Sequence, residues 1–88
     1  MEESNEILGH VLMELANKFK FNFTKKNGTY ILSNENYNFV LFIHEGAIVV
    51  ELESKNLRIN SNKVIGVYYS LSKLKKDLED NINNKLNV

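Results

Sequence analysis

The sequence predicts an α+β protein: an N-terminal helix, a four- to five-stranded antiparallel β-meander and a C-terminal helix, with both helices packed on one face of the sheet. Three observations predict this fold. Apolar residues near the N-terminus recur at helical spacing, the middle of the chain alternates apolar and polar residues between turn signals, and apolar residues near the C-terminus again step by three or four. Eighty-eight residues, 43% of them hydrophobic, suffice for a single domain over 1–88.

The first predicted element is a helix from Ser4 to Lys18. Ser4 is a favourable N-cap residue, and acidic residues near the start suit the positive end of the helix dipole. The apolar residues form one stripe of a 3.6-residue period, which predicts a helix with one buried side: Ile7, Leu8, Val11, Leu12, Leu15, Ala16 and Phe19.

Four turn signals divide the next stretch, from Phe19 to Asn60, into five short strands: Asn27-Gly28, Glu35-Asn36, Glu45-Gly46 and Lys55-Asn56. If each is a two-residue turn, the cross-strand pairs are fixed: Phe23 with Leu32, Leu32 with Phe39, Phe39 with Leu52, and Leu52 with Ile59. A slip of one residue in any hairpin would move side chains to the wrong face. All four registers place the same set of side chains on one face of the sheet, so we expect the helices to cover that face. It carries Phe19, Phe21, Phe23, Tyr30, Leu32, Tyr37, Phe39, Leu41, Ile43, Ile48, Val50, Leu52, Leu57 and Ile59.

The last predicted element is a helix from Ser61 onward, because Val64, Val67, Tyr68, Leu71, Leu74, Leu78, Ile82 and Leu86 step by three or four. Its first turns are rich in β-branched residues and contain Gly66, so Lys63 to Tyr69 has an alternative interpretation as a sixth strand. A helix from Ser61 to Leu86 would be about 37 Å long at ~1.5 Å per residue, longer than strands of about 23 Å. We therefore expect the end that carries Leu78, Ile82 and Leu86 to overhang the sheet.

Several classes of function are disfavoured. The chain has no cysteine, which excludes disulfides and thiolate-bound zinc, and its net charge of zero argues against general phosphate binding. His44 and Glu45 fit a strand end and a turn better than a metal or general-base site, and His10 fits a helix flank. We expect no enzyme activity, no cofactor, no metal and no small-molecule ligand. The acidic start and the short apolar runs predict a cytoplasmic protein with no membrane segment.

The uncovered face of the sheet carries the candidate site. In the predicted register Ile31 pairs with Val40, and Phe42 pairs with Val49, so four apolar side chains are contiguous where water would favour polar ones. Glu51, Glu53 and Arg58 form a charged rim, with Arg58 opposite Glu53. A small apolar centre inside a polar rim is typical of an interaction surface. These residues therefore predict binding of a protein partner or of a second copy of the chain.

Two alternatives remain open. Lys18, Lys20, Lys25 and Lys26 interleave with Phe19, Phe21 and Phe23, as in a platform for single-stranded nucleic acid. In the predicted register, however, the aromatic rings face the helices, so a soluble edge strand protected by lysine is the preferred interpretation. The other alternative is a small enzyme or ligand carrier around His44.

The composition suggests an origin. The chain has fourteen Asn and ten Lys but one Arg and no Pro, the skew that AT-rich codons produce. With the small size, this favours an inhibitor or immunity-type protein encoded by a phage, a plasmid or a low-GC bacterium.

Overall fold

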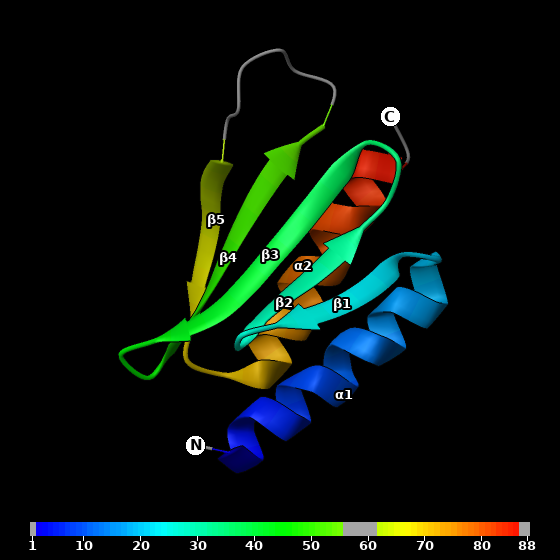
Figure 1. The fold of residues 1–88 in the computed structure, drawn as a ribbon. Helices are drawn as coiled ribbons and strands as arrows, with labels where there is room; N and C mark the ends of the chain where they lie inside the picture. The colour runs from blue at the N-terminus through cyan, green and yellow to red at the C-terminus, as the bar shows by residue number, and fades with distance from the viewer. Residues whose placement is uncertain (1, 56–61, 87–88) are drawn as a thin grey trace.

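The computed structural model describes residues 2–55 and 62–86, which form two helices and one five-stranded sheet (Figure 1). The elements are α1 (Glu2–Phe19), β1 (Asn22–Lys26), β2 (Thr29–Ser33), β3 (Tyr37–His44), β4 (Ala47–Ser54), β5 (Asn62–Tyr68) and α2 (Leu71–Leu86). The strands are antiparallel and lie in the order β1-β2-β3-β4-β5, which is a meander. The predicted α+β fold is thus confirmed.

The helix α1 begins two residues before the predicted start, so Ser4 lies inside the helix and is not its N-cap. At the other end Lys20 adopts a left-handed conformation with φ of 60°, and the Phe21 N–H donates to the Ala16 carbonyl over 2.9 Å. This six-to-one bond is that of a Schellman motif, which ends a helix and turns the chain. Phe19 therefore belongs to α1, and the first strand begins at Asn22 rather than at Phe19.

The first three hairpins have the predicted registers: Phe23 pairs with Leu32, Leu32 with Phe39, and Phe39 with Leu52. At two of the turns both central residues have positive φ, as type I′ turns require: Asn27 and Gly28, and Glu45 and Gly46. The turn before β3 is held differently, because the Asn34 Oδ1 accepts hydrogen bonds from the backbone N–H groups of Asn36 (2.8 Å) and Tyr37 (2.7 Å).

The fourth hairpin differs from the prediction. Leu52 pairs with Lys63 rather than with Ile59. Residues 62–68 form the strand β5 rather than the start of a helix, so the alternative interpretation of Lys63 to Tyr69 as a strand is the one that the structure has. The strand β5 also contains a β-bulge: Val50 pairs with Gly66 and Glu51 with Val64, so Ile65 is an extra residue without a cross-strand partner. The predicted strand that contained Leu57 and Ile59 lies outside the described residues.

The helix α2 is consequently shorter than predicted. Its sixteen residues start at Leu71, where the Ser70 carbonyl accepts the Leu74 N–H over 3.1 Å, and at ~1.5 Å per residue it extends about 24 Å. Leu78 and Ile82 are buried, so the expected overhang is wrong for them, while the side chain of Leu86 lies outside the described part. The helix matches the sheet in length because seven of the residues assigned to it form β5.

The core lies between the two helices and one face of the sheet. Both helices, the strands β2 to β5 and the residue before β1 contribute to a single buried cluster: Leu8, Leu12, Leu15, Ala16, Phe21, Tyr30, Leu32, Phe39, Leu41, Ile48, Val50, Tyr68, Leu74, Leu78 and Ile82. Phe23 and Leu52 are partly buried and pack against this cluster. Two ion pairs of 3.6 Å, Lys18 with Glu79 and Lys75 with Glu14, join α1 to α2 at the surface. All strand residues of this cluster point to the same side of the sheet. Neither helix of the described residues packs on the opposite face (Figure 1).

A tyrosine joins β5 to α2. Tyr68 is buried, and its ring lies over Gly66, where an added Cβ would collide with the ring. Burial raises the pKa of Tyr68 above its usual 10.0, and so does the Asp77 carboxylate, which accepts a hydrogen bond from the phenol. The end of the sheet is thereby fixed to the first half of α2. In residues 2–55 and 62–86, no helix has the length and apolar character needed to cross a membrane.

Candidate protein-binding face

The face opposite the helices is built from the alternate residues of each strand. Because β2, β3 and β4 keep the predicted registers, Ile31 lies beside Val40, and Phe42 lies beside Val49. All four side chains are partly exposed. The structure therefore brings together the four apolar residues that the sequence placed at the centre of the site.

The strand β5 extends this apolar area. Val64 pairs with Glu51 and Val67 with Val49, so both valines lie on the same face, and they are 54% and 51% exposed. We call the six residues Ile31, Val40, Phe42, Val49, Val64 and Val67 the open-face patch. The last two were missed because they were assigned to a helix. Their β-branched neighbourhood, Lys63-Val64-Ile65-Gly66-Val67, was the signal that favoured a strand.

Polar residues border the open-face patch. One row across the sheet is formed by Asn22, Ser33, Asn38 and Glu53, while Thr24 and Lys26 lie on β1 at one side. Glu51 stands between Val40 and Val64, and within the described residues neither Glu51 nor Glu53 belongs to an ion pair. Arg58, the predicted third member of the charged rim, lies outside the described residues. The face thus carries a cation on β1 and two carboxylates on β4, with Glu51 within the open-face patch and Glu53 in the polar row beside it.

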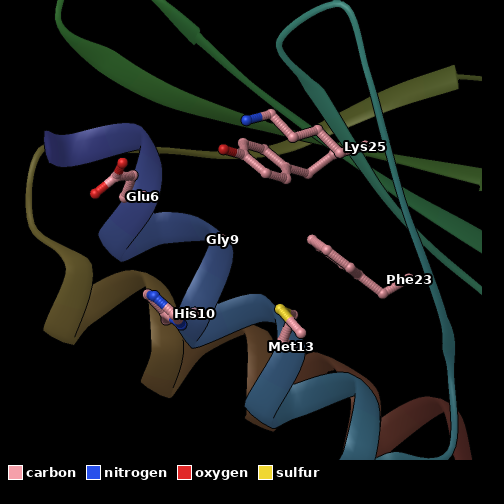
Figure 2. Close-up of a pocket in the computed structure, with 7 residues that line it drawn as sticks. Glu6, Gly9, His10, Met13, Phe23 and Lys25 are labelled. Carbon is pink, nitrogen blue, oxygen red and sulfur yellow. The ribbon is translucent and has the colours of Figure 1, made fainter. Parts of the chain in front are cut away.

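A groove lies on the other side of the sheet, between α1 and the first hairpin. It has a volume of about 410 Å³ and is lined by Glu6, Gly9, His10, Met13, Phe23, Lys25 and Tyr30. Figure 2 shows Phe23 and Lys25 of β1 on one side of this groove and Glu6, His10 and Met13 of α1 on the other. The Phe23 and Tyr30 rings stack with centroids 5.9 Å apart, and the Lys25 Nζ lies 5.3 Å from the Tyr30 centroid. This stacking and cation–π contact order the first hairpin.

The histidines do not gather into a site. His44 is exposed at the end of β3, Glu45 is the first residue of a turn, and His10 is exposed on α1. Among the residues that the structure describes, no group of three or more His, Asp and Glu side chains could hold a metal ion.

The lysines near the first strand do not share one surface. Lys20 follows α1, Lys25 lies over Tyr30 beside the groove, and Lys26 points to the open face, opposite Thr29. Phe21 is buried, with its ring edge-on to Phe39 at 5.9 Å. Phe21 is therefore not available for base stacking.

These features define a two-layer α+β protein with one helix-covered face and one apolar open face. The chain matches no known protein family, no curated protein and no solved structure.

Proposed function

We propose that this chain is a small, non-enzymatic protein-binding module whose open sheet face docks a protein partner or a second copy of the chain. The observation that carries the proposal is the open-face patch: six apolar side chains, contiguous over β2 to β5, on the face that no helix covers. Apolar patches with polar borders mark interaction sites. A cytoplasmic inhibitor or immunity-type protein, encoded by a phage or a plasmid, is the form of module that we propose.

The size of the patch sets the strength of binding. Full burial of one such side chain would stabilise a complex by ~1.5–3 kcal/mol. The six side chains are already partly covered in the monomer, so together they would contribute roughly 5–9 kcal/mol to binding. Association costs an estimated ~4–15 kcal/mol in lost freedom and ordering. The patch therefore supports a weak or moderate complex, and Glu51 within it and Glu53 beside it would select among partners through charge.

Site-specific photo-crosslinking in the cells that express the protein tests this proposal. A photoreactive phenylalanine analogue at Phe42 or Val49 should give discrete protein adducts, because these positions lie within the proposed contact. The matched control carries the same analogue at Asn17, an exposed position on α1. If Phe42 and Val49 give no adduct, or only the same adducts as Asn17, in cells that accumulate the chain to high concentration, the open face does not bind protein and the proposal fails.

A nucleic-acid-associated role for the lysine-rich first strand has less support. Its lysines diverge to different surfaces, and Phe21 packs against Phe39 rather than toward solvent. Salt-dependent binding to single-stranded DNA or RNA would be the observation that favours it.

A further inference from the structure

We propose that the occupant of the open face is a second copy of the chain, packed sheet to sheet about a two-fold axis that runs along the strands. This inference rests on the proposed function, since it names the partner of the same face. Three features of that face support it: its shape, its distribution of charge and its area.

The shape of the open-face patch suits another sheet. Four of its six residues are valines and one is isoleucine, and they come from four neighbouring strands at equivalent positions of the pleat. Short branched side chains on a pleated surface interdigitate well with those of a second sheet about 10 Å away. Phe42 is the single aromatic residue of the patch, and it lies on the central strand β3, close to the proposed axis.

The charges of the face complement their own rotated copy. Lys26 lies on β1, at one side of the sheet, whereas Glu51 lies on β4, toward the other side. A two-fold axis along the strands near β3 places the β1 side of one copy over the β4–β5 side of the other. Lys26 of each copy is then about one residue row and at most one strand from Glu51 of its partner, within reach of both long side chains. The dimer would contain this pair twice.

The available area indicates a weak dimer. Four strands at ~4.8 Å spacing and three residue rows of about 7 Å each give a contact of roughly 20 × 20 Å, or about 400–500 Å² per copy before the polar border is added. Stable complexes bury about 1,200–2,000 Å² in total. We therefore expect monomers at about 10 µM and a large dimer fraction near 1 mM.

Sedimentation velocity over this concentration range tests the inference. The wild type should pass from monomer to dimer, and Phe42→Glu should remain monomeric, with circular dichroism showing that the variant is folded. Lys26→Glu and Glu51→Lys should each weaken association at least five-fold, because each brings two pairs of like charges together in the dimer. An equimolar mixture of these two variants should associate again, since both pairs then have opposite charges.

Lys76→Glu, an exposed charge reversal on α2, is the matched control and should associate like the wild type. The inference is overturned if the wild type stays monomeric at 1 mM, if Phe42→Glu still dimerises, or if the mixture associates no better than either single variant. Adducts of foreign proteins at Phe42 together with a monomeric wild type would reject the dimer and leave the proposed function standing. Absence of every adduct at Phe42, in cells where the concentration exceeds the dimerisation range, would reject both.

Discussion

At the scale of single residues, two glycines differ in what a methyl group would meet. A Cβ added to Gly66 would collide with the Tyr68 ring. This ring cannot readily adopt another rotamer, because it is buried and its hydroxyl is hydrogen-bonded to Asp77. A Cβ added to Gly9 would lie 3.5 Å from the Tyr30 Cε1, an ordinary contact distance. Gly66 is thus needed for packing, whereas Gly9 in the middle of α1 is not.

The same substitution should consequently have opposite effects at the two positions. Gly9→Ala should raise the free energy of unfolding by about 1 kcal/mol, because alanine favours a helix interior over glycine by that amount. Gly66→Ala should lower it by about 1–3 kcal/mol through overpacking against Tyr68. Urea denaturation of both variants beside the wild type measures the difference, and two changes of the same sign would contradict the packing described for Tyr68.

At the scale of elements, the burial of Tyr68 of β5 and its contact with Asp77 of α2 make stability depend on pH. The folded protein holds the phenol proton more tightly than the unfolded chain, because the pKa of Tyr68 is raised above 10.0. Its contribution is therefore complete below the unfolded pKa and is lost as the pH rises through and beyond it. The loss falls in the alkaline range, not near neutrality.

Tyr68→Phe should remove this dependence. At neutral pH the variant should be less stable by about 1 kcal/mol, the typical contribution of one hydrogen bond. Between about pH 9 and pH 11, across the usual tyrosine pKa, its free energy of unfolding should fall less than that of the wild type. Tyr69→Phe, next along the chain but 84% exposed, is the control and should follow the wild type. Parallel pH profiles for Tyr68→Phe and the wild type would contradict the raised pKa of Tyr68.

The elements also show which part of the fold the sequence reveals. The first three hairpins were predictable because their turns carry residues suited to positive φ or to side-chain capping, and because both strands of each hairpin alternate regularly. In β5 the bulge separates the outward-facing Val64 and Val67 by three residues instead of two. The apolar residues Val64, Val67, Tyr68 and Leu71 are spaced by three, one and three positions, which is also the spacing of apolar residues on one side of a helix. Periodicity alone therefore assigned this segment to a helix instead of a strand.

At the scale of the whole molecule, the two faces of the sheet should differ in their effect on stability. Phe39 and Phe42 lie on the same strand, but Phe39 is fully buried beneath the helices and Phe42 is on the open face. Phe39→Ala should lower the free energy of unfolding by about 3–5 kcal/mol, as expected for a large cavity in a core. Phe42→Ala should lower it by about 1 kcal/mol or less, measured at 10 µM, below the expected dimerisation range. Equal losses would mean that the two faces are equally covered.

The candidate site was predictable in part for the same reason. Ile31, Val40, Phe42 and Val49 follow from registers that two hairpins fix, so the sequence places them together. The positions of Val64 and Val67 depend on the pairing of β5 with β4. No short turn joins these two strands, so the sequence does not specify their register. The groove beside α1 also depends on tertiary packing, because residues from a helix and from two strands line it.

The bulge has a consequence for the length of the chain. Because Ile65 has no partner on β4, its deletion would leave each described β4–β5 pair with its present partner, from Glu53–Asn62 to Ile48–Tyr68. Deletion of any other residue in the paired part of β5 would shift or remove a pair. Ile65 packs partly against the core, so that contact would be lost. Within β5, position 65 is therefore where homologous chains can differ in length by one residue while the sheet keeps its register.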